Sequence, residues 1–233
     1  MLLCPNHHRE ATLGAMPETE QRYYKANPYN QIKDLAEGSL KILQSTLAMQ
    51  LGSNPVVGDG IILKVDDFPL LELGLSDEKI VQVTVSLYDQ SDTLLALIER
   101  NEWITGDPLP WDLEFGTRWI KVRERKGRVS LIVDARRFPI SVQGRLWHKG
   151  HGFRINKAGI IIDGEQARGG GVQNLGLVAS RLRLNTEDHT VELKPDPRFG
   201  QMVFVSDPSL LMRTIKSVQA WQSLKYPNLL LRT

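Results

Sequence analysis

Cysteine is almost absent from this chain of 233 residues, in which Cys4 is the only one. A single thiol cannot form an intrachain disulfide, so the sequence excludes a cross-linked secreted scaffold and favours a cytoplasmic location. The chain also lacks any run approaching the roughly 18 uninterrupted apolar residues of a membrane-spanning helix. We therefore expect a protein without a membrane partner.

The chain also has no large excess of charge of either sign. The chain has 29 Lys and Arg against 27 Asp and Glu, which leaves a net charge of +2. This balance excludes a protein whose whole surface is built for nucleic acid, so any basic surface must be local. Motifs for small-molecule cofactors are also missing, because Gly169-Gly170-Gly171 lacks the following Lys-Ser or Lys-Thr of a P-loop.

Short alternating segments dominate what is present. Val81, Val83, Val85 and Leu87 alternate with polar residues, as in a half-buried strand. Further strands are expected over residues 61–65, 119–123, 129–133, 140–146, 160–162, 176–178 and 202–205. Because no helices of about 12 residues separate them, they predict a mainly β protein with an antiparallel sandwich- or barrel-like region.

Turn residues and periodicity refine this prediction. The dipeptides Lys149-Gly150 and Asp163-Gly164 predict hairpins. Residues 40–51 alternate like half-buried strands and end in an expected turn at residues 52–55. A short β-solenoid is the alternative, with rungs at residues 160–162, 172–177 and 182–185.

Three regions follow from these patterns. Residues 1–38 are expected to form short helices and a linker, residues 39–206 a β-rich domain, and residues 207–233 a C-terminal helix. Asp207 suits the N-cap of that helix, and Pro208 its first turn. One helical face, expected to pack on the β domain, carries Leu211, Ile215, Val218 and Trp221.

Metal-binding residue types gather near the amino end. Cys4 and His7 are three residues apart, so on a helix they share one face and can bind the same zinc ion. His8 points about 100° away and can serve a different metal. Two ligands do not complete a structural zinc site, which normally takes four. The alternative is a chain end that carries two solvated histidines.

The string Leu3-Cys4-Pro5-Asn6-His7-His8, continuing through residues 11–16 to 25–30, resembles the closing part of the ββα-metal motif of bacterial HNH endonucleases. Residues 98–103 and 110–112 are similar to the β-rich region that follows this motif in one subgroup. The resemblance implies that Cys4 and His7 are structural zinc ligands and that His8 binds the catalytic divalent metal.

The same resemblance implies that the catalytic site is incomplete. A Cys-x-x-Cys pair and an Asp-His segment that supplies the general base belong upstream of Leu3, where the sequence has only two residues. We therefore expect a truncated HNH-endonuclease-like protein that is inactive as a nuclease by itself. A complete nuclease assembled across a dimer is a further alternative.

A basic cluster lies farther along the chain. Its members are Lys121, Arg123, Arg125, Lys126 and Arg128, with Arg136 and Arg137 close behind. On a strand, alternate members share one face and can contact phosphates, whereas a solvated sheet face with Glu124 opposite is the alternative. We expect the β-rich region to recognise DNA or a partner protein. A non-enzymatic protein-interaction module is the competing hypothesis.

Two other residue types are expected to be structural or solvated. Trp103, Trp111 and Trp119 recur every eight residues and are predicted to anchor the core or its loops, with a ligand pocket as the alternative. The remaining histidines, predicted to lie exposed in turns, are His148, His151 and His189.

Overall fold

The computed structural model describes residues 17–19, 22–23, 38–105, 112–125, 127–163, 170–178, 180–195, 203–205 and 207–225. Two mixed β-sheets dominate these residues. Sheet A contains, from edge to edge, β1 (Gly38–Ser39), β8 (Glu102–Thr105), β7 (Leu94–Glu99), β6 (Val81–Tyr88), β5 (Phe68–Leu75), β4 (Gly60–Val65), β17 (Ser180–Leu184) and β18 (Val191–Pro195).

Sheet B branches at its longest strand. One path runs through β15 (Gly171–Val172), β14 (Gly159–Asp163), β13 (His151–Asn156), β12 (Ile140–His148), β2 (Ala48–Leu51), β3 (Asn54–Val57), β16 (Gly176–Val178) and β19 (Val203–Val205). From the other edge of β12 follow β11 (Arg128–Asp134), β10 (Trp119–Arg125) and β9 (Asp112–Gly116). Neither sheet closes into a barrel over the residues described.

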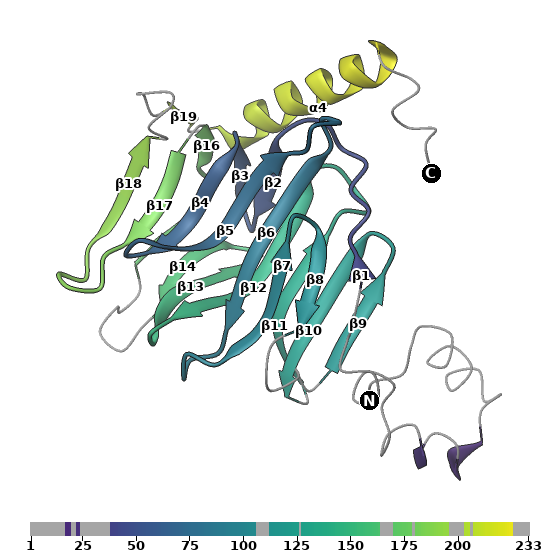
Figure 1. Ribbon diagram of the computed structural model, residues 1–233. Coiled ribbons are helices and arrows are strands. Elements are labelled where there is room, and N and C mark those ends of the chain that lie inside the picture. The colour runs from purple at the N-terminus through teal and green to yellow at the C-terminus, as the bar shows by residue number, and fades with distance from the viewer. Residues whose placement is uncertain are drawn as a thin grey trace.

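The two sheets pack face to face, with β12 lying across β5 and β6 (Figure 1). Burial alternates along β6 as the sequence predicts, and Val83 and Val85 are fully buried. From sheet B, Ile120 and Val133 complete the same core. The predicted mainly β, sandwich-like fold is therefore confirmed.

Parallel pairs make the sheets mixed, whereas the sequence predicts only antiparallel neighbours. Strand β3 runs parallel to β16 in sheet B, and β4 runs parallel to β17 in sheet A. Because β4 follows β3 and β17 follows β16 almost directly, two adjacent chain segments cross together from one sheet to the other. The solenoid alternative does not form, since residues 160–162 and 182–185 belong to different sheets.

The two predicted hairpin turns have different outcomes. Lys149 and Gly150 both have positive φ angles, 50° and 77°, and join β12 to β13 as a two-residue turn. The hairpin predicted at Asp163-Gly164 forms between β14 and β15, since Ile161 pairs with Gly171, but its connection is longer than two residues and falls largely outside the described residues. The side-chain amide of Asn54 donates to the carbonyl of Val172 at 2.7 Å. This hydrogen bond helps to hold β15 in position although no two-residue turn precedes it.

The segment of residues 40–47, which lies between β1 and β2, forms no strand. Its burial alternates as predicted, with Leu40 and Ile42 buried. The backbone N–H of Leu40 donates to Asn101 beside sheet A, and that of Lys41 donates to Thr117 beside sheet B. Because its donors are divided between the two sheets, this segment cannot continue along either one. The turn predicted at residues 52–55 covers only the first two of them, since β3 begins at Asn54.

The predicted C-terminal helix is present as α4 (Pro208–Lys225), which packs on β3 and β19. Asp207 caps it, because its Oδ1 accepts the N–H groups of Ser209 and Leu210 at 2.9 and 3.3 Å. Ile215 faces the β domain and is buried. In the part of the chain that the structure describes, no helix is both long enough and apolar enough to cross a bilayer.

Candidate functional site

A row of side chains crosses sheet B on the face turned away from sheet A. Trp119 pairs with Asp134, Asp134 with Ser141, and Ser141 with Gln50, which joins β10, β11, β12 and β2. Directly paired residues project from the same side of a sheet. Their sequence neighbours Ile120 and Val133 are buried in the core, so this row faces outward.

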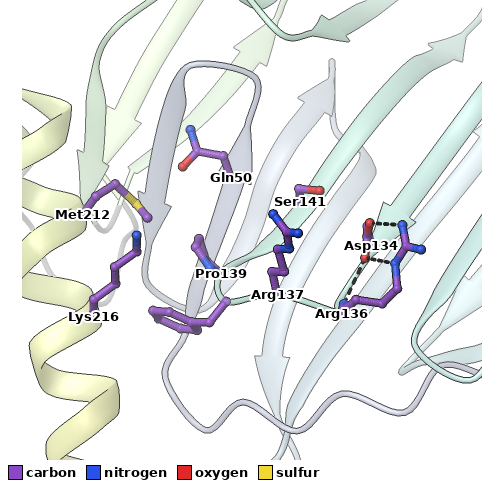
Figure 2. Close-up of a pocket in the computed structure, with 9 residues that line it drawn as sticks. Gln50, Asp134, Arg136, Arg137, Pro139, Ser141, Met212 and Lys216 are labelled. Carbon is purple, nitrogen blue, oxygen red and sulfur yellow. Dashed lines mark hydrogen bonds and ion pairs between the residues drawn. The ribbon is translucent and has the colours of Figure 1, made fainter.

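A pocket of about 710 Å³ opens over one end of this row, where α4 meets sheet B. Met212 and Lys216 reach it from the helix, and Gln50 and Ser141 lie on the strands beside it (Figure 2). The rest of the lining comes from β11 and the loop that follows it, namely Asp134, Arg136, Arg137, Phe138 and Pro139.

Arg136 and Asp134 form a close pair at the side of the pocket far from the helix (Figure 2). The guanidinium donates to both carboxylate oxygens, at 3.0 and 2.6 Å, and the backbone N–H of Arg136 donates at 2.9 Å. These hydrogen bonds hold the pKa of Asp134 below its ordinary value. Arg136 also lies 5.5 Å from the ring centre of Trp119, so two partners fix its position.

The position of the Trp119 side chain depends on Gly116, which has no side chain of its own. Gly116 pairs with Trp119 across β9 and β10, and a Cβ at Gly116 would collide with the indole ring. The absence of a side chain at Gly116 therefore leaves the space that the ring occupies. Of the tryptophans predicted to be structural, Trp103 is buried in the core as expected. Trp119 is half-buried on the outer face, and Trp111 lies outside the described residues.

Arg137 and Lys216 are the other two cations of the pocket. Over the described residues, neither has a carboxylate within ion-pair distance, although the charge of Arg137 is one of the causes that lower the pKa of Asp134. The loop that carries Arg137 is fixed at both ends, since the N–H of Ala135 donates to Arg118 and that of Ile140 donates to Gln44. Three cations and one carboxylate give the pocket lining a formal charge of +2.

The basic cluster predicted from sequence lies partly on the same face. Lys121 is directly opposite Glu114 at 3.5 Å, and the guanidinium of Arg123 binds the same carboxylate. Burial opposes ionisation of Glu114, yet the hydrogen bond and charge of Arg123 hold its pKa below the ordinary value. Carboxylates thus partly neutralise this part of the face.

The remaining members of the cluster are less informative. Arg128 pairs with Glu124 at 3.3 Å, and Arg125 is exposed at the end of β10. Lys126 falls outside the described residues.

Among the pocket residues, the sequence drew attention to Arg136 and Arg137, but it gave no signal for Gln50, Ser141 or Lys216. Strand register and helix docking bring those three residues to the pocket from distant parts of the chain.

The predicted zinc and catalytic-metal ligands, Cys4, His7 and His8, lie outside the described residues. Within the described ranges, no group of three or more His, Cys, Asp or Glu residues is arranged to hold a metal ion.

The three later histidines are not a metal site either. His148 is half-buried, with its ring stacked on Phe68 at 4.1 Å and its Nδ1 3.3 Å from Asp92, so the prediction of an exposed turn residue is wrong for it. His189 is exposed as predicted, and its ring centre lies 5.9 Å from that of the half-buried His151. Packing between the two sheets, rather than the turn itself, determines how far His148 is buried.

Comparisons with family models, with curated proteins and with solved structures find no match to this chain. Function therefore has to follow from the chemistry of the pocket and of the face around it. Arg137 and Lys216, for which the described part of the chain offers no ion pair, lie beside polar groups and the apolar side chains of Phe138 and Pro139. Such a lining suits an anion with an attached apolar part.

Proposed function

We propose that the β-rich region is a non-catalytic recognition module that binds the phosphate groups of nucleic acid through the outer face of sheet B. The observation that carries this proposal is the pair Arg137 and Lys216, which line an open pocket without a carboxylate partner among the described residues. Lys and Arg side chains that neutralise phosphates supply most of the affinity of nucleic-acid binding.

The surroundings of the pocket support the same role. Residues on one face of a strand are about 7 Å apart, so Lys121 and Arg123 follow Trp119 along β10 at about 7 and 13 Å. A phosphate backbone leaving the pocket would meet these two cations next. Glu114 binds both of them, so we expect Lys121 and Arg123 to contribute less than Arg137 and Lys216.

We further propose that this module belongs to an HNH-endonuclease-like protein. Support for this part comes only from the amino-terminal sequence around Cys4, His7 and His8. In that arrangement Cys4 and His7 would bind zinc together with two ligands from elsewhere, and His8 would bind a divalent metal. The β-rich region would contribute binding and positioning.

Fluorescence anisotropy with labelled single-stranded and duplex DNA tests the binding role. The full chain should bind DNA with an affinity that falls steeply between about 50 and 200 mM salt, because binding releases counterions. Replacing both Arg137 and Lys216 by alanine should weaken binding and reduce the slope of log affinity against log salt by about 1 to 2.

Lys157→Ala is the matched control. Lys157 is an exposed lysine in the turn between β13 and β14 of the same sheet, away from the pocket lining. Its replacement should leave the salt slope unchanged. A wild-type chain that binds neither single-stranded nor duplex DNA at low salt would overturn the proposal, and would favour the competing hypothesis that the module recognises a protein.

A further inference from the structure

The size of the pocket limits what it can hold. Its volume of about 710 Å³ lies within the range of about 300 to 1,000 Å³ that is usual for small-ligand sites. It is bounded by α4 on one side and by the Asp134–Arg136 pair on the other (Figure 2). A pocket of this size, bounded on two sides, suits one nucleotide or the end of a strand better than a continuous duplex.

The charges of the pocket are divided into two parts. Asp134 and Arg136 offset each other's charge through two side-chain hydrogen bonds. Arg137 and Lys216 remain, and together they supply two positive charges on the helix side of that pair. The place for an anion is therefore between the loop and α4.

The two positive charges of Arg137 and Lys216 match a phosphate monoester better than a phosphate within a nucleic-acid backbone. A phosphate within a nucleic-acid backbone carries one negative charge. A phosphate monoester carries a charge between −1.5 and −2 near pH 7, because its second pKa is about 6. Ser141 adds a hydroxyl group to the pocket, and Phe138 an apolar surface for a sugar or base.

Accordingly, we propose that the pocket binds a phosphate monoester, either at the end of a nucleic-acid strand or on a nucleotide. The inference rests on the proposed nucleic-acid function and names the chemical group that the pocket selects. Arg137 and Lys216 are the residues that contact the phosphate. Because they come from a sheet loop and from α4, binding requires the helix to be docked on sheet B.

The experiment compares oligonucleotides of one sequence that carry a 5′-phosphate, a 3′-phosphate or no terminal phosphate. The full chain should bind one of the phosphorylated forms about tenfold more tightly, since charge-assisted hydrogen bonds to the terminal group add to the backbone contacts. Arg137→Ala and Lys216→Ala should each remove this preference, whereas Lys157→Ala should keep it. The preference should also decrease from pH 7 to pH 5, as the phosphate takes up its second proton near pH 6.

A nucleoside 5′-monophosphate and the matching nucleoside are tested in the same way. Binding of the monophosphate alone, as tight as that of the oligonucleotide, supports the inference and identifies a free nucleotide as the source of the phosphate. Equal binding of phosphorylated and unphosphorylated strands, with salt dependence preserved, overturns the inference and leaves the proposed function standing. If the wild-type chain binds none of these strands, the proposed function itself is overturned.

Discussion

Asn101 shows how one buried amide stabilises sheet A. It lies between β7 and β8 with a positive φ of 74°. Its Oδ1 accepts the backbone N–H of Val83 at 2.8 Å, and its Nδ2 donates to the carbonyl of Val81 at 2.9 Å. Its own carbonyl accepts the N–H of Leu40 at 2.7 Å. One residue thus joins β6, the β7–β8 turn and the segment that enters the domain.

Asn101→Ala should lower the free energy of unfolding by about 2 to 4 kcal/mol, because it leaves two buried backbone groups without partners and places alanine at a positive φ. Urea denaturation followed by circular dichroism measures the change. The control is Gln82→Ala on the outward face of β6, which should cost less than about 0.5 kcal/mol. Equal destabilisation by the two variants would contradict this role of Asn101.

Individual residues differ in how well the sequence predicts them. The core positions of β6 are predictable, because alternation of apolar and polar residues is a local pattern. The role of Asn101 is not, since its partners are backbone atoms of a strand about 20 residues away. The pocket lies between these cases: Arg136 and Arg137 stand out as charges, but the docking of α4, which brings Lys216 to the same pocket, depends on contacts between distant segments.

At the scale of elements, α4 depends on its cap and forms one side of the pocket. Asp207→Ala removes the side-chain acceptor of the Ser209 N–H and one of the two acceptors of the Leu210 N–H, so these amides, Ser209 most of all, should exchange with solvent faster. Asp207→Asn keeps an acceptor oxygen and should preserve most of their protection. Hydrogen exchange followed by mass spectrometry measures both variants.

Asp188→Ala is the control for the cap. Asp188 accepts the N–H of Thr190 in the turn between β17 and β18, far from α4 in the fold. Its replacement should leave exchange at residues 209 and 210 unchanged. If Asp207→Ala also left those amides protected, the first turn of α4 would not depend on this cap.

The helix and the strands were unequally predictable. Helix α4 begins where local signals place it, because Asp207 and Pro208 act on their immediate neighbours. Strands β5, β7 and β13 are present although their sequences gave weaker alternation than that of β6. The parallel pairs could not be predicted at all, since nothing local in β3 or β4 indicates which distant segment becomes its neighbour.

At the scale of the whole molecule, the two crossing segments make the sheets depend on each other. Unfolding sheet A would remove β4 and β17, which continue directly from β3 and β16 of sheet B. We therefore expect both sheets to unfold in one transition. Trp103 reports on sheet A and Trp147 on sheet B, because both are buried.

Two variants test this expectation, one keeping only Trp103 and the other only Trp147, with phenylalanine at the other tryptophan positions. Fluorescence of the retained tryptophan and circular dichroism should give the same denaturant midpoint within each variant. Fluorescence of Trp147 that changed at a different midpoint from circular dichroism would mean that the sheets unfold separately.

The parallel pairs also determine when each strand can pair during synthesis, because the partners of β3 and β4 are made much later. Contacts such as that between Asp66 and Thr186 join residues separated by 120 positions. At typical translation rates the ribosome needs on the order of ten seconds to make that length of chain. During this time the edges of β3 and β4 are open to other nascent chains, so chaperone supply and growth temperature should govern the yield of native protein.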